Sequence, residues 1–164
     1  WKDLTAKADS VRLLCGDASA KVKTPLVFAQ LCHEMQKGHE IIMQSPYTVC
    51  NTAMFRDLSV LTIPYDRDLS LLTNAPESGA NPWGSMDFLS NRWLFLKSGI
   101  GLYELFADES MHTKTILMDD DVSIIGSYNL DRRATYLDSE TMVVVKSKAL
   151  NAQLRERMQE EAPD

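Results

Sequence analysis

The sequence contains no apolar run long enough to cross a bilayer, because its longest unbroken runs are only a few residues and a spanning helix needs roughly 18. It also lacks a basic-then-apolar leader and an excess of basic residues, since the net charge is −6 and the pI is about 5.1. A general nucleic-acid binder carries a basic face, so none is expected here. The chain begins with Trp1 rather than Met, and we expect a soluble piece of something longer, or one resting on a membrane.

Cysteine and histidine are both scarce. Cys15, Cys32 and Cys50 are odd in number and have no CxxC spacing, which favours free, buried thiols in a reducing compartment over a disulfide framework. His33 and His39 have no metal-ligand spacing with these cysteines. The sequence therefore predicts no metal site.

Helical and extended patterns alternate along a chain long enough for one compact domain. The patterns predict helices over 24–38, 51–62, 84–99 and 148–161, and strands over 40–47, 68–74, 100–106, 112–119, 122–129 and 140–145. Thr24 is the expected N-cap of the first helix, and the turn-rich segment 75–84 is either a site loop or a solvated connector. Strand–helix–strand units followed by a hairpin predict an αβα sandwich, an α/β or α+β fold with a mixed sheet flanked by helices.

The hairpin gathers polar side chains that suit phosphate chemistry. Side chains alternate along a strand, so His112 and Lys114 point to the same face. If residues 120 and 121 form a two-residue turn, Lys114 faces Ser127 and His112 faces Asn129. That turn lacks the usual Gly, so a slip of one residue is the alternative. A cation, an imidazole, a hydroxyl and an amide can together hold phosphate oxygens and attack phosphorus or protonate a leaving alcohol.

The residues of this stretch follow the pattern H-x-K-x4-D-x6-G-S-x-N, which resembles the signature of the phospholipase D superfamily, also called the HKD family. The matching positions are His112, Lys114, Asp119, Gly126, Ser127 and Asn129. An acidic residue commonly follows 28 positions after the signature His in that family, and Glu140 stands there. The segments "IIMQSPYTV", "LSLLTN" and "SYNLDRRATYLDSE" are similar to the second signature half of bacterial cardiolipin synthase-like proteins.

The resemblance implies a role for each catalytic position. His112 would be either the nucleophile that forms a phosphohistidine or the acid that protonates the leaving alcohol, and Glu140 would accept a hydrogen bond from its other ring nitrogen. Lys114 would hold phosphate oxygens. Asp119 belongs to the signature, but its parity puts it off the His112 face, which favours a supporting or turn-capping role.

Substrate contacts are expected from Ser127, Asn129 and Gly126 of the signature, and from Tyr47 at a strand end, for which a packed aromatic is the alternative. Ser127 could equally be a plain turn or strand serine. Arg132 and Arg133 either reach lipid or phosphate or form ordinary surface pairs.

The predicted protein is the C-terminal catalytic half of a cardiolipin synthase-like phosphatidyltransferase or phosphodiesterase that needs no metal or cofactor. Residues 1–23 would be the approach from an upstream half, and residues 24–164 the catalytic domain with one signature. Its partners would be anionic phospholipid and that upstream half, and it would sit peripherally on the cytoplasmic side of the bacterial membrane. The alternatives are a homodimeric endonuclease or phosphodiesterase with this signature, and a non-catalytic half retained for packing or partner binding.

Overall fold

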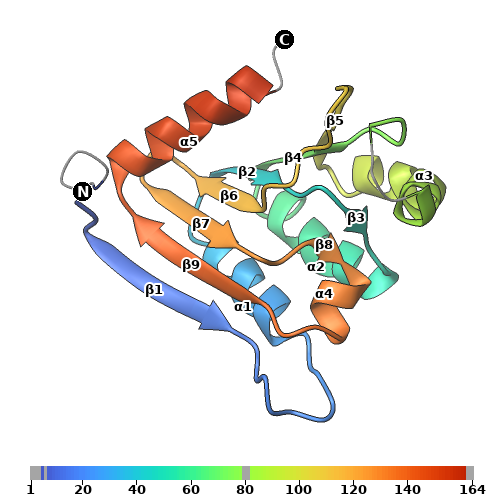
Figure 1. The fold of residues 1–164 in the computed structure, drawn as a ribbon, viewed down its shortest axis with the longest axis horizontal. Coiled ribbons are helices and arrows are strands. Elements are labelled where there is room, and N and C mark those ends of the chain that lie inside the picture. The colour runs from blue at the N-terminus through green and yellow to red at the C-terminus, as the bar shows by residue number, and fades with distance from the viewer. Residues whose placement is uncertain (1–4, 6, 79–81, 162–164) are drawn as a thin grey trace.

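The computed structural model describes residues 5, 7–78 and 82–161, and it shows a seven-stranded mixed sheet with helices on both faces (Figure 1). The helices are α1 (Leu26–Met35), α2 (Thr52–Thr62), α3 (Pro82–Lys97), α4 (Arg132–Tyr136) and α5 (Lys148–Glu161). The strands are β1 (Ser10–Cys15), β2 (Glu40–Gln44), β3 (Thr48–Val49), β4 (Asp68–Asn74), β5 (Gly101–Leu105), β6 (Thr115–Met118), β7 (Val122–Gly126), β8 (Leu130–Asp131) and β9 (Thr141–Lys146). The expected αβα sandwich with a mixed sheet is confirmed.

The strand order is β1-β9-β7-β6-β2-β4-β5. Strands β2, β4 and β5 are parallel, and helices α2 and α3 form the crossovers between them, as parallel neighbours require. From β6 onward the chain makes antiparallel pairs with β7 and then β9. Strand β1 lies within the expected approach 1–23, yet it pairs with β9 along its whole length and is an edge strand of the sheet.

The main core lies between the sheet and helices α1 and α2. Alternate strand residues such as Ile41, Ile116 and Ile124 point into it and are essentially inaccessible to solvent. Helix α3 adds Phe95, whose ring centroid lies 4.6 Å from that of Phe55 in an edge-on contact. Helix α5 covers part of the opposite face of the sheet (Figure 1). Helices thus lie on both faces of the sheet, and α5 leaves part of its face uncovered.

A side-chain cap fixes the first residue of α2 but not that of α1. Asn51 caps α2 as its sequence suggests, because its side chain accepts a hydrogen bond from the Met54 N–H at 3.0 Å. Thr24 is not the cap of α1: the carbonyl of Pro25 accepts the first helical bond, from Ala29 N at 2.9 Å, so the cap position falls one residue later.

The three cysteines are free thiols. Cys32 and Cys50 are buried as expected, and burial raises the pKa of the Cys32 thiol to about 12. Cys15 contradicts the expectation, because it lies exposed at the end of edge strand β1.

The β6–β7 hairpin differs from the expected register by one residue. Met118 pairs with Val122, so the turn contains three residues, 119 to 121, instead of two. Asp119 takes the extra position in the left-handed region, with φ of 48°, a conformation that Asp tolerates better than most residues. The alternative of a one-residue slip is therefore confirmed, and the expected oppositions of Lys114 to Ser127 and of His112 to Asn129 are wrong. The Lys114 carbonyl instead accepts a hydrogen bond from the Gly126 N–H at 3.2 Å.

Candidate active site

Three of the predicted residues meet just before strand β6. Lys114 Nζ lies 3.4 Å from each ring nitrogen of His112 and donates to the His112 carbonyl at 2.7 Å. The Tyr47 ring stands edge-on to the imidazole, with ring centroids 6.3 Å apart. His112 is exposed and Lys114 is half-buried. An accessible imidazole beside an amine is thus fixed at one end of the hairpin.

Glu140 and Ser127 form a second part of the site. The Ser127 hydroxyl donates to the Glu140 carboxylate and accepts from the Thr141 N–H at 3.0 Å. Burial raises the pKa of Glu140, while the Ser127 hydrogen bond and the Lys114 charge oppose that rise. Burial likewise lowers the pKa of Lys114, and the Glu140 charge opposes it. In the part of the chain described, Lys114 rather than Glu140 contacts the His112 ring nitrogens.

Asn129 lies on the segment between β7 and β8 and shares a cavity with Tyr47, the residue that contacts His112. Its Oδ1 atom is buried and has no hydrogen-bond partner among the described residues. Buried amide atoms without partners are rare because they lose their hydration without compensation. The amide lines a cavity of about 670 Å³ together with Tyr47, Arg132 and Arg133. A bound phosphodiester only accepts hydrogen bonds, so it would take them from the NH2 group of this amide, turned to the position now assigned to Oδ1.

Gly126 is required by packing. A Cβ atom at this position would lie 2.1 Å from the Thr141 carbonyl oxygen and 2.8 Å from Met142 Cα, both backbone atoms of β9. The absent side chain lets the end of β7 approach β9 closely. Gly126 thereby sets the path of the segment that carries Ser127 and Asn129.

Asp119 is not brought to this group. It follows β6 at the end opposite His112, about 20 Å away at the rise of an extended strand. Its Oδ1 accepts from the backbone N–H groups of His39 and Glu40, both at 3.0 Å. The side chain therefore ties the hairpin turn to the start of β2.

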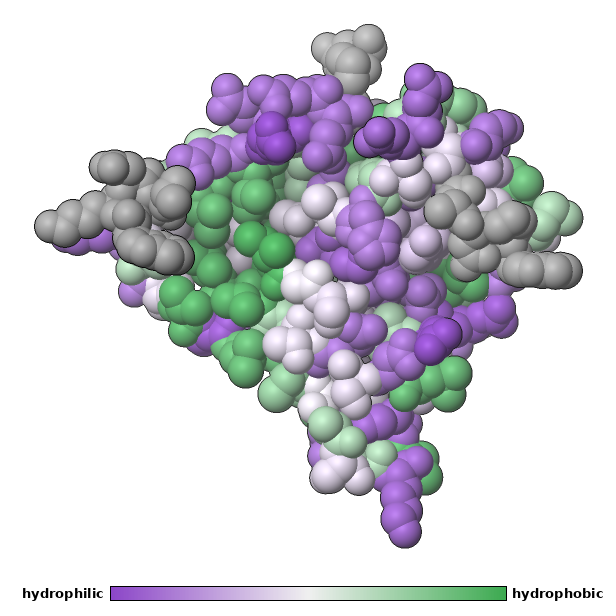
Figure 2. All heavy atoms as spheres, in the orientation of Figure 1, coloured by the Kyte–Doolittle hydropathy of each residue, from purple (hydrophilic) through white to green (hydrophobic). Residues whose placement is uncertain are grey.

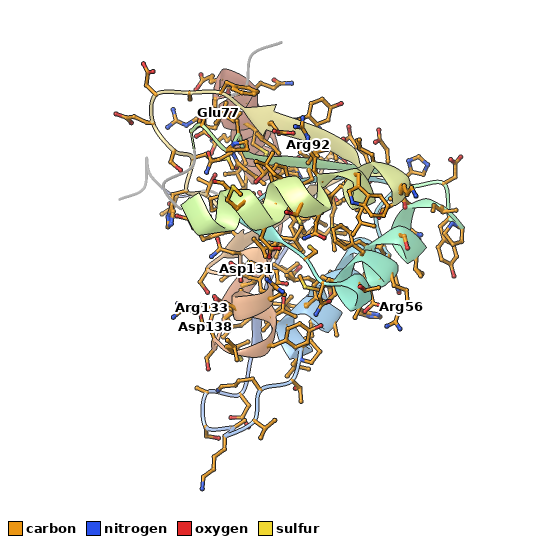
Figure 3. The ribbon with its side chains drawn as sticks, turned by 90° about the vertical axis from the view of Figure 1, so that its right-hand side faces the viewer. Arg56, Glu77, Arg92, Asp131, Arg133 and Asp138 are labelled. Atoms are coloured by element: carbon orange, nitrogen blue, oxygen red, sulfur yellow. The ribbon has the colours of Figure 1, made fainter. Side chains whose placement is uncertain are left out.

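Charged residues line the cavity, and the sequence did not decide their roles. Asp131 caps α4 by accepting from the Ala134 N–H at 2.7 Å, and burial raises the pKa of its carboxyl. Arg133 pairs with Asp138 at 3.0 Å, and Figure 3 shows these residues together on one face. Arg132 pairs with Asp87 of α3. An Asp directly before a short helix is the signal that could have marked Asp131.

Within the described residues, no group of three or more His, Cys, Asp or Glu side chains could hold a metal ion. Nor does any described helix have the length and apolarity to cross a membrane.

Comparison with known proteins places the chain in a family. Residues 31–161 match the family described as "Cardiolipin synthase, PLD-like domain". The chain belongs to this phospholipase D-like family. It is similar to cardiolipin synthase A of Serratia proteamaculans, with 29% identity over 70% of this chain and 23% of that protein. It is 31% identical to the Cronobacter sakazakii enzyme over 71% of this chain and again 23% of that protein.

The chain thus spans about a quarter of the length of these curated relatives. Solved structures share its fold. Nuc from Salmonella typhimurium, a phospholipase D family member, has a TM-score of 0.66 at 19% identity and 93% coverage of both chains. Phosphatidylserine synthase from Haemophilus influenzae has a TM-score of 0.64 at 14% identity, covering 92% of this chain and 38% of that one.

Proposed function

We propose that this chain is one catalytic half of a cardiolipin synthase-like phosphatidyltransferase that works through a phosphohistidine at the cytoplasmic face of a bacterial membrane. The observation that carries the proposal is the contact of Lys114 with the His112 ring, together with Tyr47, which stands against that ring and lines the same cavity as the unpartnered amide of Asn129. Family membership supports the same chemistry.

The reaction needs two histidines. One attacks phosphorus, forming a P–N bond as the P–O bond to the departing alcohol breaks, and the other gives that alkoxide its proton. An acceptor alcohol, such as the glycerol head of phosphatidylglycerol, then loses its proton to the second histidine and displaces the first. His112 fills one of these positions, and Lys114 and Asn129 hold the phosphate oxygens. His33 lies on α1, and His39 lies beside Asp119 at the end of the hairpin opposite His112, so another polypeptide segment must supply the second histidine.

A partner surface lies on the face of the sheet beside α5. Figure 2 shows hydrophobic atoms gathered over β1, β9 and β7. The strand registers put Val11, Leu13, Ile125, Val143 and Val145 on this face, and Val11 and Leu13 are each more than 60% exposed. An apolar patch of this kind marks an interaction site. We assign it to the upstream half, because the curated relatives are about four times as long as this chain.

A second candidate is a homodimeric phosphodiesterase in which two copies of the chain bring two His112 side chains together. The observation that favours it is that the Nuc chain and this chain cover 93% of each other. The net charge of −6 disfavours nucleic acid as its substrate.

Light scattering combined with a transferase assay on phosphatidylglycerol tests both. We expect the 164-residue chain to be inactive alone and to gain activity when mixed with the upstream half. An active homodimer would move the function to the second candidate. A strictly monomeric, fully active chain would contradict the two-histidine mechanism, and a fully assembled but inactive pair would indicate a non-catalytic half.

A further inference from the structure

Helix α3 is apolar on both sides. The helix predicted over 84–99 is observed as Pro82–Lys97. Phe88 and Phe95 are buried against the core. On the outward side, spacings of three, four and three residues align a stripe of exposed side chains. We call this the α3 stripe, which consists of Met86 (64% exposed), Leu89 (44%), Trp93 (51%) and Leu96 (62%). The outward side of a solvated helix is normally polar, so such a stripe indicates a covered surface.

The outward sides of the other long helices are different. On α5 the exposed positions include Gln153, Glu156, Arg157 and Glu160, as on an ordinary solvated helix. The α3 stripe is therefore a local feature of one helix.

Cations border the α3 stripe. Lys97 Nζ lies 4.5 Å from the centroid of the Trp93 ring, in a cation–π contact. Arg92 stands on the other border and pairs with Glu104 at 2.6 Å. An exposed indole with a lysine beside it is typical of a membrane–water interface, where the ring enters the acyl boundary and the ammonium group reaches the headgroups.

We propose that the α3 stripe docks on a phospholipid surface, with the helix lying in the plane of the headgroups. The proposal rests on the proposed function in taking a lipid as the partner. From Met86 to Leu96 the stripe runs about 15 Å, half the thickness of the hydrocarbon core, so the helix lies in the interface and does not cross it. One convex ridge of four side chains suits a deformable bilayer. A protein partner needs about 800 Å² and 20 to 30 residues on each side.

Docking through α3 would orient the site. Asp87 on the same helix pairs with Arg132, which lines the cavity containing Asn129. Figure 3 shows α3 crossing the face on which Asp131, Arg133 and Asp138 lie. A bilayer in contact with the α3 stripe therefore lies beside the cavity mouth. Because the chain is acidic overall, we expect its binding to depend on buried apolar surface and to weaken little with salt.

Flotation with vesicles of equal phosphatidylglycerol and phosphatidylcholine tests the proposal on the full 164-residue chain. We expect Leu89→Ser combined with Trp93→Ser to reduce vesicle binding at least tenfold. Val22→Ser combined with Leu26→Ser is the matched control, because it removes two exposed apolar side chains far from α3 and should leave binding unchanged. Thermal unfolding followed by circular dichroism checks that both variants fold.

A second measurement leaves the α3 stripe unchanged. In a chain carrying Trp1→Phe and Trp83→Phe, Trp93 is the only indole, and brominated phosphatidylcholine should quench its fluorescence on vesicles. Unquenched Trp93, equal vesicle binding by the two double variants, or an α3 variant that changes only the oligomeric mass would each overturn the proposal.

Assays on the assembled enzyme distinguish a failure of this proposal from a failure of the proposed function. If the α3 double variant keeps full turnover of a monomeric short-chain substrate and loses turnover of vesicle lipid, both proposals stand. If vesicles bind the unsubstituted chain through Trp93 but the assembled enzyme turns over neither substrate, the docking stands and the function fails.

Discussion

Replacing Asp119 tests whether this signature residue acts in chemistry or in folding. Its Oδ1 accepts two backbone hydrogen bonds, from His39 and Glu40, and its own backbone has φ of 48°. Arg155 also donates to the Asp119 carbonyl at 2.7 Å, but no substitution removes that oxygen. We predict a loss of stability with the chemical step intact.

The magnitude depends on which contacts each substitution removes. Asp119→Ala loses two hydrogen bonds to a charged acceptor near the surface, about 1.5 kcal/mol each at the lower end of the usual range. It also puts Ala in the left-handed region, which costs about 1 kcal/mol more. The expected loss is about 4 kcal/mol. Asp119→Asn keeps an Oδ1 acceptor and tolerates the same backbone, so about 1 kcal/mol is expected, and Asp119→Gly should fall between them at about 3 kcal/mol.

Urea unfolding of the chain measures this series. With a slope of about 2 kcal/mol/M, the Ala variant should unfold at a urea midpoint about 2 M lower, and the Asn variant within about 0.5 M of the unsubstituted chain. In the assembled enzyme, below the unfolding temperature, both should keep kcat within a few-fold. A midpoint unchanged in the Ala variant would refute the capping role, and a hundredfold loss of kcat in a folded Asn variant would return Asp119 to the chemistry.

Four further outcomes are expected. His112→Asn should lower phosphatidylglycerol turnover at least a thousandfold without a change in circular dichroism, with exposed His33→Asn as the control; activity above about 1% would contradict the assignment. Gly126→Ala should cost several kcal/mol in urea unfolding, because its Cβ meets backbone of β9. Excess chelator should leave the rate of the assembled enzyme unchanged; a rate restored only by a divalent ion would point to another mechanism. Arg12 and Lys37 lower the pKa of the buried Glu34 carboxyl to about 2 from 4.5, so these ion pairs give stability that is complete above about pH 4.5 and lost toward pH 2. Glu34→Gln should therefore cost about 2 kcal/mol at neutral pH and make the free energy of unfolding depend less on pH. A variant that loses stability with falling pH as steeply as the unsubstituted chain would count against a role for these ion pairs.

The sequence predicts those elements whose signals are local. Asn51 caps α2, and Leu69, Leu71 and Leu72 mark β4, whose observed bounds are the predicted ones. The sequence pattern does not predict strand β1, because only Leu14 among its six residues is buried and no alternation of buried and exposed residues marks it. The two-residue strands β3 and β8 exist only because segments far apart in sequence pair with each other.

The identities of the candidate site residues follow from the signature, but their contacts do not. The expected register differs from the observed one by one residue because Asp119 joins the turn as its third residue. Its carboxylate is held there by hydrogen bonds from His39 and Glu40, a long-range contact with no local signal. The hydrogen bond from Ser127 to Glu140 depends on side-chain conformations that spacing does not specify. Gly126 shows the converse: the signature marks it, and only the structure gives the packing reason.

The charges of the site explain why one half should not suffice. A phosphodiester brings a negative charge that increases on its oxygens as the transition state forms. Arg132 and Arg133, which line the cavity, already pair with Asp87 and Asp138. Beside His112, burial lowers the pKa of Lys114 and so disfavours its charged form. A phosphate held by Lys114 alone would lose hydration with little compensation. We therefore expect the partner half to supply a second cation as well as a second histidine, and expect substrate binding, not only turnover, to require both halves.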